Sequence, residues 1–389
     1  MRPPRDLVLV GGGHSHVEVL RRFARRPPPA GVRLTLLTRA RYTPYSGMLP
    51  GYVAGHYAWD AAHIDLGQLA AFADARLVED TAVGLSLDSR SVQLAGGESI
   101  TYDCLSINIG STPCPSAPGA SEHATAVKPI PAFDAHWRRL LTRVRERTAP
   151  LRIAVVGGGA GGVELLLAMQ YRLRRERRAL GGDPDQLAFT LFTRSPQPLP
   201  SHAASVQRRF RRLLAARGVT LQCGRTVTRV DPHGLMTDDG FHPADEVIWV
   251  TQAGGAPWLR DSGLALDPQG FIAVRETLQS VTDPAVFAAG DIASMTAHPR
   301  EKAGVIAVRQ GPPLARNLRR AVAGRPLKPW RPQRHWLGLI STGDRYAVAS
   351  RGPFSAEGRW LWHYKDWLDR RFMRRFRTPA VRRHPAESP

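Results

Sequence analysis

Glycines at a regular spacing follow a short apolar run in the second half of the chain. Gly157, Gly159 and Gly162 stand in the order Gly-x-Gly-x-x-Gly after Ile153-Ala154-Val155-Val156. In such a turn the first glycine permits tight reversal, the second lets backbone approach a pyrophosphate, and the third lets helix and strand pack closely. The following helix offers free N–H groups to phosphate. The spacing therefore predicts a turn that binds a dinucleotide.

A second, less regular turn stands near the start. Gly11 and Gly13 occupy the expected places after Leu7-Val8-Leu9-Val10, but the third position is His16. We expect His14 and His16 to open a helix as a solvated pair near phosphate. A metal site would need further ligands at suitable spacing, and the sequence offers none, so no metal is predicted.

A carboxylate follows a third apolar run, Val286 to Ala289, as the pair Gly290-Asp291. Ligands of doubly wound sheets bind at the carboxyl ends of strands. A carboxylate there can accept hydrogen bonds from the ribityl hydroxyls of a flavin, while Gly290 permits a close approach. The alternative is that Asp291 caps the N-terminus of the next helix, and both can hold.

The elements around these residues repeat one design. Each glycine turn lies between an apolar strand and a helix, and a second apolar strand follows at Leu34-Thr35-Leu36-Leu37 and at Phe189-Thr190-Leu191-Phe192. Strand, glycine turn, helix and strand begin a doubly wound fold. The predicted fold class is α/β, with two Rossmann-like dinucleotide-binding domains and a smaller C-terminal region.

Taken in order, these segments resemble the pyridine nucleotide–disulfide oxidoreductase superfamily. Between the turns and Gly290-Asp291 lie two strand-turn segments, residues 105–110 and 248–253, which complete the family's pattern. The resemblance implies an enzyme that takes hydride from NAD(P)H onto bound FAD and passes electrons to a small-molecule acceptor. It implies an FAD domain at 1–120 and 270–325, an inserted NAD(P) domain at 121–269, and a C-terminal region at 326–389.

Within the superfamily, the chain most resembles the type II NADH dehydrogenase branch, and in particular an oxidoreductase module fused to selenide–water dikinases. Residues 42–51 resemble that module's flavin-side loop, and residues 302–311 resemble its helix beneath the isoalloxazine. Glu164, near the contact of nicotinamide and flavin, and Glu301 and Lys302 are predicted to tune the ring. The resemblance assigns the following residues to FAD: Gly11, Gly13, His14, Thr38, Arg39, Met48, Leu49, Ile109, Gly110, Gly290, Asp291 and Gln310. It assigns these to NAD(P)H: Gly157, Gly159, Gly162, Glu164, Thr193, Arg194, Gln252 and Ala253.

Three departures from the family pattern bear on specificity. Where an acid commonly holds a ribose, the first unit reads Thr38-Arg39 and the second reads Thr193-Arg194-Ser195. Arginine beside hydroxyls suits a 2′-phosphate, so we expect NADPH to be accepted. The branch's quinone motif carries two glutamines, and residues 304–309, which align with it, carry neither. The acceptor therefore stays open, with a quinone as one candidate.

The cysteines bear on an alternative chemistry. Cys104, Cys114 and Cys223 form no CxxC pair, which argues against disulfide stapling and dithiol chemistry. Sulfide:quinone oxidoreductases share this fold and use cysteines beside the flavin, so a sulfide, sulfur- or selenium-compound oxidoreductase is the main alternative. Because no helix start or cation is placed to stabilise a thiolate, we favour inert cysteines.

Charge and the C-terminal stretch suggest a surface partner. The formal net charge is +21, and Trp360, Leu361, Tyr364, Trp367, Leu368 and Phe372 recur at helical spacing among arginines. These residues are predicted to form one apolar face that binds an anionic membrane. The alternatives are packing on the protein's own body and a homodimer seam. Since both fingerprint units lie upstream, we expect the helix to be removable without loss of flavin reduction.

Two further expectations concern partners and compartment. Basic runs at 174–178 and 208–212 would be the footprint of a nucleic-acid-binding protein with a vestigial nucleotide fold, but no nucleic-acid module is present, so no nucleic acid is predicted. No run of about 18 apolar residues exists, so no transmembrane helix is expected. We expect a cytoplasmic protein, with peripheral attachment to the inner face of the cell membrane as the consequence of a membrane-binding helix.

Overall fold

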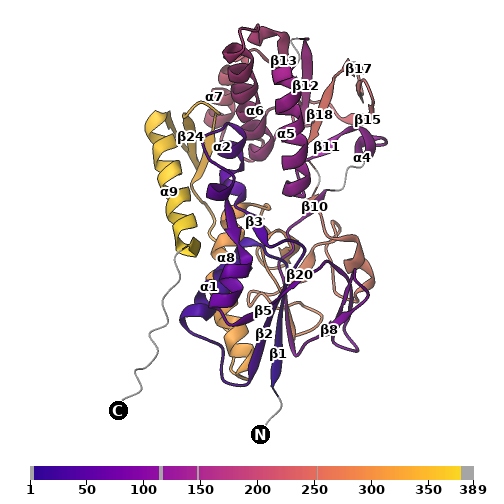
Figure 1. Ribbon diagram of the computed structural model, residues 1–389, viewed down its shortest axis with the longest axis vertical. Helices are drawn as coiled ribbons and strands as arrows, with labels where there is room; N and C mark the ends of the chain where they lie inside the picture. Colours follow the sequence, from indigo (N-terminus) through magenta and orange to yellow (C-terminus); the bar gives the residue numbers. More distant parts are fainter. Residues whose placement is uncertain (1–3, 114–116, 147–148, 252, 378–389) are drawn as a thin grey trace.

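The computed structural model describes residues 4–113, 117–146, 149–251 and 253–377. Two units, each built on a five-stranded sheet, are stacked along the long axis, and a C-terminal helix runs along one side (Figure 1). The predicted α/β class with two dinucleotide-binding units is confirmed.

The first unit centres on a parallel sheet in the order β21-β9-β1-β2-β5. Its strands are β1 (Arg5–Val10), β2 (Val32–Thr38), β5 (Ala75–Glu79), β9 (Cys104–Ile107) and β21 (Val286–Ala288). Helices α1 (His14–Arg25) and α8 (Gly304–Val322) pack against each other beside it. Residues 7–10 of β1 and all of β9 are buried, which explains the apolar run at the end of β1.

The second unit repeats this order of connections as β11-β18-β12-β13-β14. Its strands are β11 (Thr125–Ala126), β12 (Leu151–Val156), β13 (Leu187–Thr193), β14 (Val219–Cys223) and β18 (Glu246–Trp249). Its long helices are α5 (Ile130–Glu146), α6 (Ala160–Ala179) and α7 (Ala204–Ala216). In both units the glycine turn follows the middle strand, so both turns open at the carboxyl edge of a sheet.

Smaller elements complete the units. The antiparallel strands are β3 (Tyr42–Pro44) with β4 (His63–Asp65), β6 (Ala82–Ser86) with β7 (Ser91–Leu94) and β8 (Ser99–Thr101), β10 (Thr112–Pro113) with β19 (Ala253–Gly254), and β15 (Val227–Asp231) with β16 (Gly234–Thr237) and β17 (Gly240–Pro243). The parallel pair is β20 (Ile272–Val274) with β22 (Ala293–Met295). The short helices are α2 (Leu49–Val53), α3 (Leu66–Phe72) and α4 (Ala120–His123), with 3-10 turns at η1 (Ser46–Met48), η2 (Asp60–Ala62), η3 (Pro184–Gln186), η4 (Pro257–Asp261) and η5 (Gly290–Ile292).

The chain returns to the first unit earlier than the predicted residue 270. Ala256, Leu259 and Leu264 are buried in the core of the first unit, together with the strands of its sheet. The pairing of β10 with β19 marks the two crossings between the units. The first unit therefore resumes at about residue 254, a point that short irregular segments conceal in the sequence.

The C-terminal region joins both units. It comprises β23 (Gly338–Ser341), β24 (Ala347–Arg351), β25 (Phe354–Gly358) and α9 (Arg359–Arg377). Ile340 and Val348 pack into the core of the second unit, while Met373 and Phe376 pack into that of the first. Because α9 supplies part of that core, removing the helix would also remove core side chains of the first unit, and the expectation that flavin reduction survives its removal stays a prediction.

The predicted single apolar face of α9 is also wrong. Leu361 is buried and Phe372 packs against the first unit's core, whereas Trp360, Tyr364 and Trp367 have exposed fractions of 62%, 41% and 46%. A helical spacing alone does not show which side of a helix packs against the protein. The sequence analysis therefore treated the inward residues and the outward residues as one apolar face.

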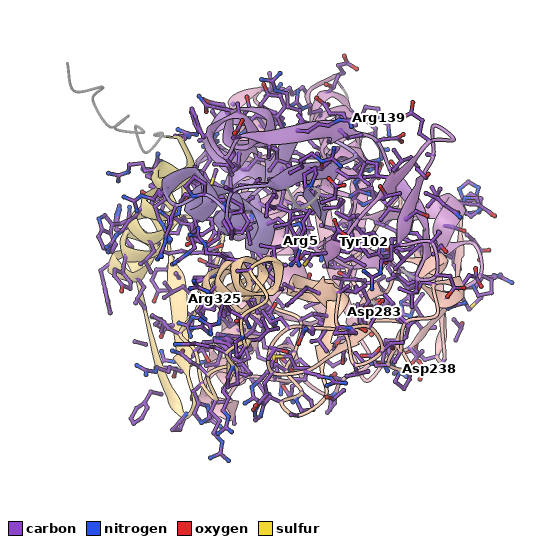
Figure 2. The ribbon with its side chains drawn as sticks, turned by 90° about the horizontal axis from the view of Figure 1, so that it is seen from below. Arg5, Tyr102, Arg139, Asp238, Asp283 and Arg325 are labelled. Atoms are coloured by element: carbon purple, nitrogen blue, oxygen red, sulfur yellow. The ribbon has the colours of Figure 1, made fainter. Side chains whose placement is uncertain are left out.

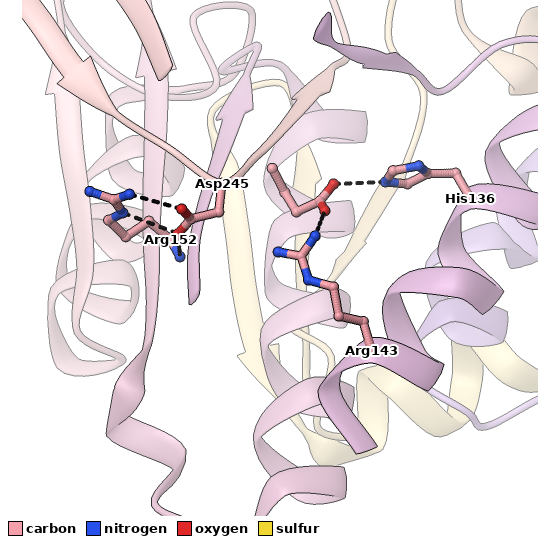
Figure 3. A network of polar contacts seen from close by, with 5 residues as sticks. His136, Arg143, Arg152 and Asp245 are labelled. Atoms are coloured by element: carbon pink, nitrogen blue, oxygen red, sulfur yellow. Dashed lines mark hydrogen bonds and ion pairs between the residues drawn. The ribbon is translucent and has the colours of Figure 1, made fainter. Parts of the chain in front are cut away.

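A polar network holds the far edge of the second sheet. Arg152 donates to both carboxylate oxygens of Asp245, and Glu246 bridges His136 (2.9 Å) and Arg143 (2.5 Å) of α5 (Figure 3). Arg152 lies near the beginning of β12, and Asp245 and Glu246 lie at the beginning of β18, at the opposite end of these strands from the glycine turn. The network therefore fastens α5 to the sheet and leaves the carboxyl edge to ligands.

Among the described residues, no helix is long and apolar enough to cross a membrane. The same part of the chain holds no group of three or more histidine, cysteine, aspartate or glutamate residues arranged for a metal ion.

Candidate active site

Asn108 organises the carboxyl edge of the first sheet. Its Oδ1 accepts the backbone amides of Ser15 (3.1 Å) and His16 (3.2 Å), and its Nδ2 donates to the carbonyl of Ala289 (2.6 Å). A Cβ on Gly13 would lie 2.3 Å from that Oδ1. Glycine is therefore required where β1, β9 and β21 converge. Sequence reasoning missed Asn108, although a polar residue at the end of an apolar strand was the available signal.

His16 replaces the third glycine of the first turn with a hydrogen-bonded ring. The ring is fully buried, with Nδ1 2.7 Å from the carbonyl oxygen of Gly11 and Nε2 2.8 Å from Oγ of Ser106. Burial lowers the pKa of His16 to about 4, so the imidazole is neutral at pH 7. The prediction of a solvated residue at this position is wrong, because the ring ties the turn to β9.

His14 is not solvated either. It begins α1, half-buried, with its ring edge-on to Tyr45 at 5.3 Å and to Phe372 of α9 at 6.4 Å. Burial lowers its pKa to about 4, and the nearby Asp291 only partly opposes this shift. Its Nε2 is buried and has no partner among the described residues. A buried nitrogen of this kind fits a ligand that supplies the missing hydrogen bond.

Gly290 and Asp291 lie where the sequence places them, at the end of β21. Gly290 is left-handed (φ +72°) and donates its N–H to Oε1 of Gln310 at 2.6 Å. Asp291 lies within the short turn η5, whose N-cap is Ala289, so its alternative role as an N-cap is wrong. Its Oδ2 accepts from Nζ of Lys128 at 2.9 Å. Among the described residues none hydrogen-bonds the other carboxylate oxygen, Oδ1, which suits it to a ligand.

Lys128 was not identified from the sequence. Its Nζ also donates to Oγ of Ser111 at 2.8 Å, so it links the segment that leaves the first unit to Asp291. Ile109 and Gly110 precede this point, and Gly110 is left-handed (φ +74°). Ala253 lies in β19, which pairs with β10, whereas Gln252 lies outside the described residues.

The predicted flavin-side loop lies under α9. Met48 is buried and Leu49 begins α2. Nζ of Lys365 in α9 donates to the carbonyl of Gly47 and to Oδ2 of Asp369, both at 2.7 Å. Tyr45 stacks on Phe372 at 4.5 Å. The C-terminal helix thus forms one wall of the region that holds His14.

Glu164 faces the same wall from the second unit. Its Oε1 accepts the backbone N–H of Ser341 (2.6 Å) and its hydroxyl (2.9 Å). Burial raises the pKa of Glu164 and of Asp369. Burial opposes the charge of Lys365, but Asp369 and Glu164 outweigh it and raise the pKa of that ammonium. Two carboxylates therefore share one buried cation, an arrangement that can hold a proton.

The second glycine turn has the geometry of a phosphate cradle. Gly157 is at φ +138°, and a Cβ on Gly162 would lie 1.9 Å from the carbonyl oxygen of Gly157. Gly159 faces open space, and α6 begins there without a side-chain cap. Uncapped amides beside open space fit the pyrophosphate of a dinucleotide.

Neither strand end offers a carboxylate to a ribose. Thr38 is buried and its hydroxyl donates to the carbonyl of Ala40, and Arg39 beyond it is exposed. Thr193 is buried, its Oγ1 accepts the N–H of Ser195 at 3.2 Å, and Arg194 is exposed.

A cavity of about 610 Å³ joins the two units. Gly290, Asp291 and Gln310 line it from the first unit, and Arg194 lines it from the second. Lys302 also lines it, with Nζ 2.6 Å from the carbonyl of Ala293 and 3.9 Å from the ring centre of Phe271; burial lowers the pKa of Lys302. Glu301 lines the same cavity and is exposed. Residues assigned to FAD and to NAD(P)H thus meet in one space.

The two described cysteines do not line this cavity. Cys104 begins β9 and is buried, and burial raises its pKa to about 12. Cys223 ends β14 half-buried, and burial raises its pKa as well. Cys114 lies outside the described residues. Both described thiols are protonated at neutral pH, which favours the inert interpretation.

Two dinucleotide-binding units that share one cavity define a flavoprotein oxidoreductase of the two-dinucleotide type. The sequence pattern of the pyridine nucleotide-disulphide oxidoreductase family matches residues 5–317, so the chain belongs to that family. Its cofactors are accordingly FAD and NAD(P)H, and the resemblance to this superfamily is confirmed.

Individual relatives narrow the comparison. Demethylphylloquinone reductase NdbB from Synechocystis is 26% identical over 294 residues, which cover 70% of this chain and 69% of the relative. The sulfide:quinone oxidoreductase of Aquifex aeolicus superposes with a TM-score of 0.80 at 17% identity, covering 96% of this chain and 91% of the other. An engineered water-forming NADPH oxidase bound to NADPH superposes with a TM-score of 0.71 at 21% identity, covering 89% and 75%.

Proposed function

We propose that this protein is an NAD(P)H dehydrogenase that delivers electrons to a quinone. The observation that carries the proposal is the single cavity in which Asp291 and Gln310 of the first unit meet Arg194 of the second. A quinone acceptor is supported by the relative named as a demethylphylloquinone reductase. Bound FAD supplies the chemistry of accepting hydride and releasing electrons.

The chain's own residues bind and orient the two cofactors. The first amides of α6 hold the pyrophosphate of NAD(P)H, and Asp291 accepts hydroxyls of the ribityl chain. Gly290 and Gln310 fix the backbone beside it. The buried group of Glu164, Lys365 and Asp369 holds a proton between α6 and α9, next to the flavin-side loop. On this proposal Glu164 serves the side of the flavin that faces α9, whereas Lys302 and Glu301 serve the side that faces the cavity.

NADPH is proposed as a substrate because of the end of β13. In the engineered NADPH oxidase, three consecutive substitutions replace aspartate by alanine, alanine by arginine and methionine by serine. This chain carries Thr193-Arg194-Ser195 at the end of β13, with arginine and serine in the same order and no acid. A guanidinium there attracts a 2′-phosphate, which a carboxylate would repel.

A sulfur- or selenium-compound oxidoreductase is the alternative on this fold. The sulfide:quinone oxidoreductase supports it through likeness of fold. Against it, Cys104 and Cys223 are protonated and neither lines the cavity. The nucleic-acid alternative gains no support, because the family and relatives that match are oxidoreductases. Arg5, Arg139 and Arg325 are labelled at separate places in Figure 2.

We also propose peripheral binding to an anionic membrane through α9. Trp360, Tyr364 and Trp367 form an exposed aromatic stripe, and the guanidinium of Arg371 lies over the ring of Trp367 at 5.1 Å. Aromatic rings beside arginines suit an interfacial helix. A homodimer that buries the same stripe is the competing outcome, which sedimentation without lipid would reveal.

The test begins with protein purified with its FAD. Anaerobic mixing with NADPH or NADH should bleach the flavin absorbance, and a soluble quinone should then restore it. Restoration by a quinone, with no reduction of the flavin by sulfide, supports the proposal. Reduction by sulfide instead would establish the alternative, and absence of reduction by either nucleotide would refute the proposed function.

A further inference from the structure

Two cations in the shared cavity have no acidic partner in the part of the chain that the structure describes. Of the basic residues lining it, Lys302 is engaged by the carbonyl of Ala293, and His298 pairs with Glu276 at 2.7 Å. Arg194 and Arg300 form no ion pair with any carboxylate among the described residues. Arginine side chains that line a cavity without a paired carboxylate are suited to an anionic ligand.

Arg300 is held in place by backbone groups. Its Nη1 donates to the carbonyl of Pro299 at 2.8 Å and its Nε to the carbonyl of Gln333 at 3.3 Å. These two bonds orient the planar guanidinium and leave Nη2 for a ligand.

Arg194 extends from a backbone that is fixed on both sides. The carbonyl of Thr193 accepts the N–H of Arg225 at 3.0 Å, and the carbonyl of Ser195 accepts that of Gly224 at 2.9 Å. The side chain is exposed, and it lines the cavity from the second unit. The backbone that carries the Arg194 side chain is thus held by hydrogen bonds on both sides.

The segments that carry the two arginines meet at this cavity. Arg300 and Glu301, in the loop before α8 of the first unit, line the same cavity as Arg194, in the loop after β13 of the second. Both guanidinium groups therefore reach one space.

We propose that Arg300 and Arg194 together bind the 2′-phosphate of NADPH, one from each unit. The inference rests on the proposed use of NAD(P)H. The ribose of the nucleotide is expected at the end of β13, where Arg194 stands. A phosphate with nearly two negative charges needs more than one cation, and guanidinium groups bind it bidentately. The pyrophosphate has its own cradle at α6, which leaves these arginines to the 2′-phosphate.

The experiment uses FAD-loaded protein and two probes, 2′,5′-ADP and 5′-AMP, titrated by calorimetry. Arg300→Gln should weaken 2′,5′-ADP roughly tenfold, the loss of one charge-assisted bond, and leave 5′-AMP unchanged. Arg300→Lys should restore part of the affinity. Arg334→Gln is the matched control, because Arg334 is an exposed arginine of the same region outside the cavity lining. Equal FAD content in all variants shows that they are folded.

Kinetics supply the second arm. In Arg300→Gln, kcat/KM should fall roughly tenfold for NADPH and stay constant for NADH. An equal loss for both nucleotides would place Arg300 on the shared pyrophosphate and overturn the proposal, as would unchanged affinity for 2′,5′-ADP. If neither nucleotide reduces the flavin, the proposed function fails, but the two calorimetric probes still decide the role of Arg300.

Discussion

Restoring the family's glycine at position 16 should destabilise this protein. His16→Gly removes two hydrogen bonds from a fully buried ring, at about 1 kcal/mol each. The unfilled volume adds about 1 kcal/mol or more, and glycine in a helix costs up to about 1 kcal/mol against alanine. The expected loss in free energy of unfolding is about 4 kcal/mol. His16→Ala should lose about 1 kcal/mol less.

Urea unfolding at pH 7.5, followed by circular dichroism and by the fluorescence of released flavin, measures this loss. Arg25→Gly is the control, since Arg25 is exposed in the last turn of the same helix and reports the cost of helical glycine alone. If His16→Gly loses no more than Arg25→Gly, the ring has no structural role. The turn would then accept either residue, as a pattern of three glycines implies.

Four further outcomes follow from the site. Asp291→Ala should lower the FAD content of purified protein, measured by absorbance, because it removes an acceptor for ribityl hydroxyls; full occupancy would contradict this. Arg194→Glu should shift the ratio of kcat/KM toward NADH, and an unchanged ratio would remove Arg194 from the nucleotide site. Stability from His16 should be complete above pH 6.5 and lost as pH falls toward 4, since its folded pKa is about 4; urea midpoints that stay constant across this range would show otherwise. Alanine at Trp360 and Trp367 should reduce co-sedimentation with anionic vesicles at both low and high salt, whereas equal sedimentation of variant and wild type would assign binding to charge elsewhere.

The parts of the site that the sequence revealed are those made by local geometry. Gly157 and Gly290 have positive φ, and Gly162 lies against the carbonyl oxygen of Gly157, so these requirements arise within a few residues and the spacing predicted their places. Apolar runs such as β1 and β12 predicted the two sheets for the same reason, because buried parallel strands need no polar alternation.

The residues that sequence reasoning missed act across long separations. Asn108 joins the first turn to β21, and Lys128 reaches Asp291 across 163 positions. Ser341 binds Glu164 across 177 positions. No periodicity encodes such pairs, because the partners are brought together by the order of strands in the sheets. The burial of His16 was missed for the same reason, since Ser106 stands 90 positions away.

The C-terminal helix shows why the membrane and redox roles need to be separated by surface substitutions. Truncation before Gly358 would remove the aromatic stripe, but it would also remove Met373 and Phe376 from the first core and Lys365 from the carbonyl of Gly47. Loss of flavin reduction in such a protein would then say nothing about membranes. The outward side chains of Trp360 and Trp367 can be changed while the inward face stays intact. An effect on vesicle binding without an effect on flavin reduction by NADPH would show that one helix carries two independent functions on opposite faces.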